Sequence, residues 1–179
     1  RDSASATPPP RTAGPEAVAP AWGKGDGVPS RMAAFLSSRG APHGTGDAII
    51  RLVELTDEEG RPVAIVEFDT VVRVHIWIEC VRACTVSVNY KIRNRQLVSV
   101  AGADFLIAGC PLEQMEPGRR YHVEYTTHLA LQDGDYTLRS SVTTPIDRHD
   151  QAVFIDVVEV AAPFTVLPAA RGRIYTQAY

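Results

Sequence analysis

The feature that most restricts the fold of this chain is the alternation of apolar and polar residues from residue 46 onward. In the segment 84–93, the apolar set is Cys84, Val86, Val88, Tyr90 and Ile92, and the polar set is Thr85, Ser87, Asn89, Lys91 and Arg93. A period of two places each set on one face of a β-strand, whereas a helix would scatter both sets around its axis. The segment is therefore predicted to be a strand with one buried and one polar face.

Similar segments recur along the chain and are separated by turn residues. The predicted strands cover residues 48–56, 68–79, 84–93, 96–100, 121–129, 136–142 and 152–160, the last with an extension toward residue 167. Short strands of this kind, without a long amphipathic helix, predict an all-β protein: an antiparallel β-sandwich with immunoglobulin-like or jelly-roll connections over residues 46–168. A closed barrel is an alternative, but the uneven connections favour two sheets.

Residues 1–45 have a different composition. They contain seven of the thirteen prolines and six of the thirteen glycines, which neither pack a core nor propagate a helix or strand. They are predicted to be a largely irregular linker, which suggests a module tethered to another domain. Residues 30–38 form either a short docking helix, with Met32, Phe35 and Leu36 on one face, or a transient turn. Residues 169–179 are predicted to be a C-terminal tail.

Charge and cysteine content argue against several classes of protein. The net charge of −3 and the pI near 6.0 give no basic field, so nucleic-acid binding is not expected. No apolar run is long enough to span a membrane. Three cysteines are too few and of the wrong parity for a disulfide scaffold, which favours a reducing, cytoplasmic setting. Cys80 and Cys84 are interpreted as half-buried thiols, with a disulfide between them left open.

The chain contains no recognisable catalytic motif. A phosphate-binding loop, a nucleophile elbow and a His-Glu-x-x-His helix are all missing, so no enzyme activity, cofactor or metal is predicted. The cluster Asp-Arg-His-Asp at 147–150 is interpreted as a solvated loop. A hydrolase centred on His149 remains a third hypothesis.

Two polar rows on the outer faces of strands are the candidate binding surfaces. Amide, hydroxyl and guanidinium groups can bond sugar hydroxyls, and an aromatic ring can stack on a sugar ring. The first row is Ser87, Asn89, Lys91 and Arg93, predicted to lie beside Arg139, Ser141 and Thr143. The second row, on the opposite sheet, is Arg73, His75, Trp77 and Glu79, predicted to lie beside His122, Glu124 and His128. The alternative interpretation of each row is a solvated strand face.

The predicted carbohydrate-binding residues are Ser87, Asn89, Lys91, Arg93, Arg139, Ser141, Thr143, Trp77 and His75. Trp77 is expected to be exposed in mid-strand and so to need a partner; burial under the linker or a subunit contact are the alternatives. The last strand, 153–160, is apolar on both faces for much of its length, which indicates that both sides are covered. Strand exchange in a dimer, or coverage by the linker or the tail, would each provide this.

The order of several motifs resembles the C-terminal domain of the Wzt-type ATP-binding subunits of O-antigen polysaccharide ABC exporters. The motifs are GTGDAII at 44–50, VEL at 53–55, DEEGRPV at 57–63, YKIRNR at 90–95, GAD at 102–104 and DGDYTL at 133–138, with RGRIY at 171–175 as an aromatic tail. The chain departs from the family at Asp104-Phe105, where an Asn-Thr pair is common.

The resemblance implies a non-catalytic carbohydrate-binding module that recognises the O-polysaccharide, at its non-reducing end, before export. It implies a β-sandwich that dimerises by exchange of the C-terminal strand. The resemblance also implies that an ATPase domain precedes the linker and that the full transporter, with its membrane permease, holds the domain at the cytoplasmic side of the inner membrane. A structural or protein-interaction sandwich that binds no glycan is the alternative.

Overall fold

A computed structural model describes residues 17–18, 31–146 and 151–169 of the chain. Its elements, in chain order, are β1 (Ala17–Val18), α1 (Arg31–Ser38), β2 (Ala48–Thr56), β3 (Ile65–Val66), β4 (Thr70–Cys80), β5 (Cys84–Asn94), β6 (Ser99–Asp104), β7 (Glu113–Met115), β8 (Arg120–Leu129), β9 (Gly134–Pro145) and β10 (Ala152–Val166).

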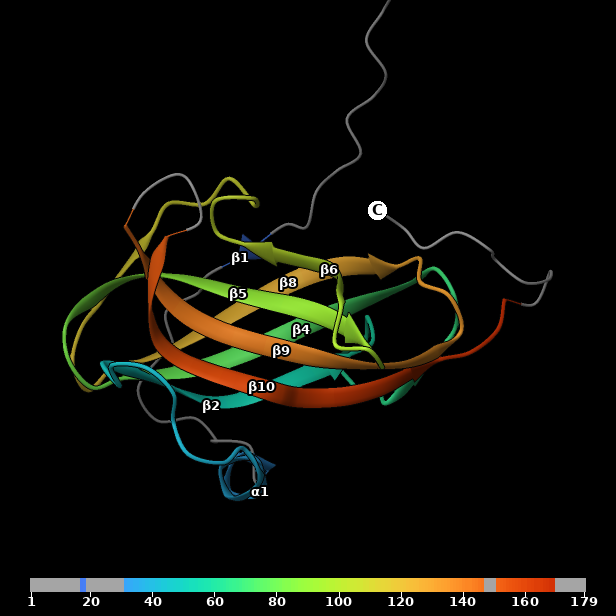
Figure 1. The fold of residues 1–179 in the computed structure, drawn as a ribbon, viewed down its shortest axis with the longest axis horizontal. Helices are drawn as coiled ribbons and strands as arrows, with labels where there is room; N and C mark the ends of the chain where they lie inside the picture. Colours follow the sequence, from blue (N-terminus) through green and yellow to red (C-terminus); the bar gives the residue numbers. More distant parts are fainter. Residues whose placement is uncertain (1–16, 19–30, 147–150, 170–179) are drawn as a thin grey trace, which may run out of the picture.

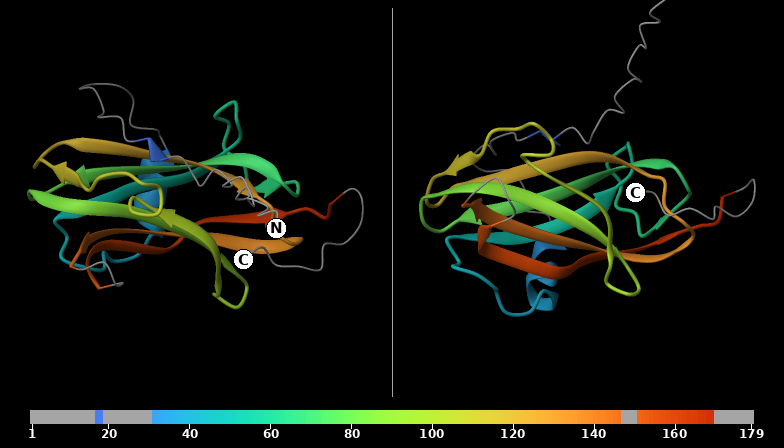
Figure 2. Two further views of the ribbon diagram at one scale, coloured as in Figure 1. Left: turned by 90° about the horizontal axis from the view of Figure 1, so that it is seen from above. Right: turned by 45° about the horizontal axis from the view of Figure 1, so that its top comes forward.

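The strands form two sheets that pack face to face (Figures 1 and 2). One sheet has the order β1-β8-β4-β2, and the other has the order β3-β10-β9-β5-β6, with β7 added to the start of β5. All neighbouring strands are antiparallel except β3 and β10, which pair in parallel. The predicted antiparallel sandwich is confirmed.

The core lies between the sheets and is built from the apolar rows that the alternation predicted. The fully buried side chains of β4 and β5 are Val72, Val74, Ile76, Ile78, Cys80, Val86, Val88, Tyr90 and Ile92. Tyr90 and Tyr125 contact each other across the core with ring centroids 5.1 Å apart. The Tyr125 hydroxyl donates a hydrogen bond of 2.5 Å to the carbonyl of Val88, which satisfies a buried polar group and joins the two sheets.

The hairpin after β5 differs from the prediction. The strand predicted at 96–100 begins only at Ser99 and continues to Asp104. The side chain of Asn94 accepts hydrogen bonds from the backbone amides of Gln96 and Val98, both 3.0 Å long, and Leu97 has a φ of 62°. The residues after Asn94 therefore form a side-chain-capped turn instead of entering the strand. The short strands β1, β3 and β7 were not predicted.

Helix α1 lies within the segment 30–38, for which the sequence left a helix and a transient turn open. Met32 and Phe35 are buried in the core cluster, and Leu36 packs against it. Arg31 forms an ion pair of 2.8 Å with Glu54 on β2. Figure 1 shows the helix beside β2 at the lower edge of the sandwich. The boundaries of linker, domain and tail at residues 45 and 168 stay predictions.

A buried ion pair joins the residue after α1 to both sheets. The Arg39 guanidinium lies 2.5 Å from the Asp156 carboxylate and also donates to the carbonyl of Ile50. The second carboxylate oxygen of Asp156 accepts a hydrogen bond of 2.7 Å from the Ile50 amide. The two charged side chains are only 3% and 0% exposed, so each charge depends on the other for its stabilisation.

A β-bulge in β10 brings Asp156 into this position. Phe154 pairs with Thr143, but Asp156 pairs with Val142, so Ile155 is the extra residue. The bulge changes the alternation, because Phe154 keeps to the outer face while Asp156 joins the inward face of Val142. The sequence alone does not show this irregularity.

The segment after Arg39 covers the edge of β10 near the bulge. The amides of Thr45 and Gly46 donate to the carbonyls of Phe154 and Ile155, at 3.1 and 2.9 Å. Gly44 has a φ of +125°, and a Cβ there would lie 2.5 Å from the Ile155 carbonyl oxygen, so only glycine fits. This contact covers an edge of the strand and not both of its faces, since Val153, Phe154 and Val160 are exposed. The predicted coverage of both faces therefore stays a prediction.

Breaking the Arg39–Asp156 pair tests its contribution to stability. Asp156→Ala leaves the buried Arg39 charge without its counter-ion and the Ile50 amide without an acceptor, and we expect the free energy of unfolding to fall by about 3–5 kcal/mol. Urea unfolding followed by circular dichroism measures this change. The matched control is Arg119→Ala, because Arg119 forms an ion pair of 2.7 Å with Glu116 but is 66% exposed; little change is expected. Equal effects of the two variants would contradict the role given to Asp156.

Candidate functional site

The first predicted polar row comes together on the outer face of β5 and β9. The strand register places Ser87 opposite Thr143, Asn89 opposite Ser141 and Lys91 opposite Arg139. The predicted neighbourhood of these side chains is therefore confirmed, and Arg93 follows on the same face at the end of β5. Their role in binding stays a prediction.

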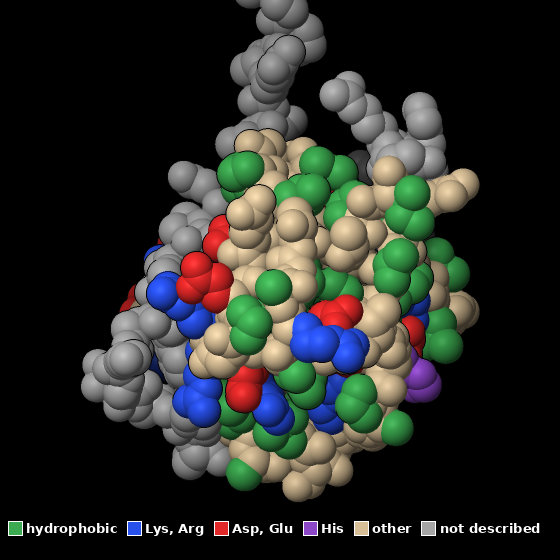
Figure 3. Space-filling model, turned by 90° about the vertical axis from the view of Figure 1, so that its left-hand side faces the viewer, with side chains coloured by type: hydrophobic (Ala, Val, Ile, Leu, Met, Phe, Trp, Pro, Cys, Tyr) green, Lys and Arg blue, Asp and Glu red, His purple; other side chains and the backbone are tan. Residues whose placement is uncertain are grey.

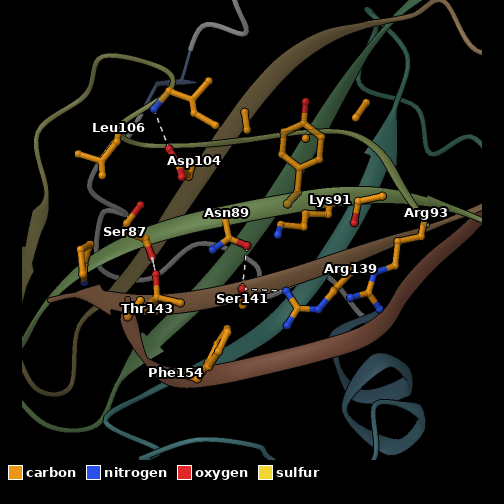
Figure 4. A pocket seen from close by; sticks show the side chains of 18 of the residues that line it. Ser87, Asn89, Lys91, Arg93, Asp104, Leu106, Arg139, Ser141, Thr143 and Phe154 are labelled. Carbon is orange, nitrogen blue, oxygen red and sulfur yellow. Dashed lines mark hydrogen bonds between the residues drawn. The ribbon is translucent and has the colours of Figure 1, made fainter. Parts of the chain in front are cut away.

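These side chains form the floor of a groove of about 560 Å³ (Figure 4). One wall is β6 with the loop that follows it, and Phe154 of β10 lies on the other side. Gly102 allows β6 to approach β5 closely, because a Cβ at this position would lie 2.5 Å from the Tyr90 carbonyl oxygen. The volume is in the range of small-molecule sites, so the groove can hold a short part of a larger ligand.

The floor is a chain of hydrogen-bonded polar side chains. Ser141 donates from its hydroxyl to the Asn89 amide oxygen at 2.7 Å, and Arg139 donates from Nη1 to the Ser141 hydroxyl at 3.3 Å (Figure 4). These bonds fix the orientation of the amide and the hydroxyl. Ser87, Arg139, Ser141 and Thr143 are buried, whereas Lys91 is exposed, so this part of the row is not a solvated strand face.

Two arginines in the groove share one carboxylate. The Glu159 carboxylate lies 3.2 Å from Nε of Arg139 and 2.7 Å from Nη1 of Arg93. Burial acts to raise the pKa of Glu159, but the Arg139 and Arg93 guanidinium groups outweigh it and hold that pKa below its usual value. Glu159 is therefore ionised at neutral pH and orients both guanidinium groups.

The apolar part of the groove is exposed. Phe154, Leu106 and Ile107 are 47%, 56% and 68% exposed, and the Arg139 guanidinium carbon lies 5.7 Å from the centroid of the Phe154 ring. Asp104 accepts a hydrogen bond of 2.7 Å from the Ile107 amide and so shapes the loop that bears both aliphatic side chains. The site therefore combines an aromatic ring and aliphatic groups with fixed hydrogen-bonding groups.

Sequence reasoning missed the apolar members of this groove. Phe154 had been assigned to a strand with two apolar faces, and residues 104–107 to no element. The register between β9 and β10 would have placed Phe154 correctly. Phe154 pairs with Thr143, and paired residues of neighbouring strands lie on the same face of the sheet. No signal in the sequence places Leu106 and Ile107, which lie on a loop.

The second predicted row lies on the outer face of the other sheet and does not meet the groove. His75 pairs with Glu124 and Trp77 with His122, so these residues of β4 and β8 lie side by side as predicted. His128 pairs with Val71 and lies farther along the strand. The two candidate surfaces are therefore on opposite faces of the sandwich.

Trp77 is not the exposed tryptophan that the sequence predicted. It is partly buried and packs against the rings of His122 and His75, at centroid distances of 4.7 and 5.5 Å. His122 lies opposite Trp77 on β8, and His75 lies two residues before it on β4. The two imidazole centroids are only 5.1 Å apart, so both rings pack side by side against the indole. The expectation that Trp77 is exposed was therefore wrong, and its need for an outside partner stays a prediction.

The two histidines belong to a chain of polar contacts. Thr56 Oγ1 lies 2.9 Å from Nε2 of His75, and Nδ1 of His75 lies 2.9 Å from Nε2 of His122. Burial lowers the pKa of His75, although Glu124 acts in the opposite direction. Burial and the nearby His75 lower the pKa of His122 to about 4. Both imidazoles are consequently neutral at pH 7.

The disulfide left open between Cys80 and Cys84 is not formed. Both residues are free thiols. The cluster 147–150 and the aromatic tail 171–175 lie outside the described residues.

Within the described ranges, no helix is long and apolar enough to cross a membrane. Acidic and basic side chains are mixed with hydrophobic ones on the face in Figure 3, so that face shows no uniform basic patch.

Comparison with known proteins identifies a family model that matches this chain. The model of the Wzt C-terminal domain matches residues 41–175. No curated protein matches the chain. The crystal structure of the C-terminal domain of Wzt superimposes with a TM-score of 0.67 at 12% identity, covering 76% of this chain and 81% of that chain. This similarity supports the fold.

Two further solved structures are more distant. The Pseudomonas fluorescens alkylpurine DNA glycosylase AlkC, bound to DNA with an abasic-site analogue, has a TM-score of 0.44 at 12% identity, covering 68% of this chain and 30% of that chain. A CARDB domain from Pyrococcus furiosus, in complex with di-metal ions, has a TM-score of 0.41 at 10% identity, covering 71% of this chain and 95% of that chain. Neither similarity bears on the site.

Thiol reactivity tests the environment of Cys84. Burial, followed by the nearby Cys80, raises the pKa of Cys84 to about 12. A raised pKa lowers the thiolate fraction at pH 8, and an ordinary thiol has a pKa of about 8.5, so we expect iodoacetamide to modify Cys84 at least about 100-fold more slowly in the folded chain than in urea. Peptide mapping by mass spectrometry measures both rates. Similar rates would contradict the half-buried environment of this thiol.

Proposed function

The chain belongs to the Wzt C-terminal domain family, and we propose that its groove binds the O-antigen polysaccharide as a non-catalytic module of an ABC exporter. The observation that supports this most directly is the composition of the groove. It combines an exposed aromatic ring, Phe154, with the hydrogen-bonded side chains of Asn89, Ser141 and Arg139.

This combination suits a sugar ring. A pyranose has an apolar C–H face, which can stack on the Phe154 ring, and hydroxyl groups around its rim, which can bond the Asn89 amide and the Arg139 guanidinium. The fully buried Ser141 hydroxyl holds these two groups in place. Because the hydrogen bonds within the floor fix these groups before binding, less side-chain entropy is lost when the ligand binds. The groove faces outward on a rigid sheet. The end of a long polymer can therefore bind in it, while the rest of the polymer stays outside.

Affinity for a single sugar unit is expected to be weak. Each hydrogen bond contributes about 0.5–1.5 kcal/mol net, because the groove and the sugar both exchange bonds with water. Two linked sites would raise the effective affinity for one polymer or for neighbouring polymers. A dimer would provide that second site.

We further propose that two copies associate through β10, that the domain lies in the cytoplasm, and that it acts at the inner membrane next to the permease of the transporter. Val160 on β10 is 60% exposed, which leaves an apolar side chain available on this strand. The family relationship supports the transporter context.

A protein-interaction role without a glycan is the second candidate. The exposed Leu106 and Ile107 at the rim of the groove favour it, since aliphatic side chains on a loop are common in protein interfaces. This role predicts that the groove variants described next have no effect on polysaccharide binding.

The first test compares Phe154→Ala with Val153→Ala. Calorimetric titration with O-antigen polysaccharide from the strain that encodes the chain should show about a tenfold loss of affinity for Phe154→Ala, because aromatic stacking is worth about 0.5–1.5 kcal/mol beyond buried area. Val153 is the matched control, since it is the neighbouring residue, is exposed to a similar degree and does not line the groove.

Trp77→Ala is the control for the opposite face and should leave the affinity unchanged. A loss with Trp77→Ala but not with Phe154→Ala would contradict the assignment of the groove. Failure of the unaltered chain to bind the polysaccharide would contradict the proposed function itself.

The association state tests the proposed dimer. Light scattering coupled to size exclusion should give a mass about twice the 19.5 kDa of the chain. Val160→Lys places a charge on the exposed stretch of β10 and is expected to shift the mass to that of one chain, whereas Leu97→Lys, at a residue 63% exposed in the β5–β6 turn, should not. A single-chain mass for the unaltered protein would contradict the dimer.

A further inference from the structure

A cluster of potential metal ligands lies on the outer face of β4 and β8, opposite the groove. His75, His122 and Glu124 each offer one ligand atom, and these three atoms all lie within 4.8 Å of one another. They lie together because His75 pairs with Glu124 and because His122 is two residues before Glu124, on the same face of β8. The cluster is therefore built into the sheet and not into a loop.

The separations between the ligand atoms are close to those around a small cation. In a tetrahedral zinc site with bonds of about 2.0–2.1 Å, neighbouring ligand atoms are about 3.3 Å apart. Nδ1 of His75 lies 2.9 Å from Nε2 of His122 and 3.5 Å from the Glu124 carboxylate. The two imidazoles form a direct hydrogen bond with each other. A metal ion would take the place of the proton in this bond after both rings turn about their side-chain bonds, without a change in the backbone.

Contacts outside the cluster orient the ligands. Thr56 Oγ1 lies 2.9 Å from Nε2 of His75, which leaves Nδ1 directed at His122 and Glu124. Arg73 Nε lies 3.7 Å from one oxygen of Glu124, while the other oxygen faces His75. Such contacts to the second atom of a ligand, here a hydrogen bond to His75 and an ion pair with Glu124, are typical of protein metal sites, where they fix the ring and carboxylate orientation.

The surroundings of the cluster favour an ion over two separate protonated histidines. Trp77 covers the two imidazoles, and the His75 side chain is only 12% exposed, so water gives little stabilisation to a positive charge on a ring. A neutral imidazole with a free lone pair is the form that binds a metal. The Glu124 carboxylate supplies a compensating negative charge.

From these contacts we infer that His75, His122 and Glu124 bind a divalent transition-metal ion, of which Zn²⁺ is the representative. Two imidazoles and one carboxylate are a ligand set that suits zinc, whereas Mg²⁺ and Ca²⁺ prefer oxygen ligands alone. Among the described residues no fourth His, Cys, Asp or Glu belongs to the group, so one position is left for water. The bound ion joins β4 to β8 and stabilises the sandwich by binding only the folded state.

The test is a calorimetric titration of the metal-free chain with ZnCl₂. We expect one ion per chain with a Kd of about 10 µM, weaker than four-ligand structural sites because one ligand is water. His122→Ala should raise the Kd by at least about tenfold. The matched control is His128→Ala, since His128 is on the same strand, is 68% exposed and does not belong to the cluster; its Kd should be unchanged.

Two further measurements keep the inference testable if His122→Ala folds poorly. Glu124→Gln keeps the size of the side chain and should also weaken Zn²⁺ binding by about tenfold. Co²⁺ should give visible absorption bands with the unaltered chain, and Zn²⁺ should remove them. Absence of saturable binding up to 1 mM, on the order of 100 times the expected Kd, overturns the inference, as does equal weakening by His128→Ala.

Discussion

The buried carboxylate of Asp156 is the interaction on which the arrangement of this domain depends. It binds the Arg39 guanidinium after α1 and the Ile50 amide on β2, while its own strand, β10, belongs to the other sheet. A single carboxylate thus joins the helix and both sheets. The bulge that turns Asp156 inward also leaves Phe154 outward, so the contact that closes the core and the aromatic ring of the groove come from the same irregularity.

The sequence was sufficient for the sheets and for the polar floor of the groove, because alternation determines which side chains share a face. The prediction that Asn89 lies beside Ser141 needed only that the two strands are antiparallel neighbours in one sheet. The sequence was not sufficient to predict that Phe154 lines the groove or that the floor is buried. The bulge and the covering loop that cause these features are tertiary and leave no periodic signal in the sequence. The prediction that Trp77 is exposed failed for a related reason. Alternation identifies which residues lie on the outer face, but not the imidazoles that cover a residue there.

The two outer faces of the sandwich differ in chemistry. Across β5 and β9, hydroxyl, amide and guanidinium groups lie beside an exposed ring, which suits a neutral or weakly charged polymer rich in hydroxyl groups. Across β4 and β8, two imidazoles and a carboxylate converge to within a few ångströms, which suits a single ion. The apolar core separates the faces, so the two proposed sites can be altered independently.

A map of the glycan contact by nuclear magnetic resonance tests binding in the groove. Titration of ¹⁵N-labelled chain with O-antigen polysaccharide should shift the amide signals of Asn89, Ser141 and Phe154 together with the loop around Leu106. Signals on the opposite face, around Trp77 and His122, should not move. Shifts confined to that opposite face, or no shifts at saturating polysaccharide, would contradict the account.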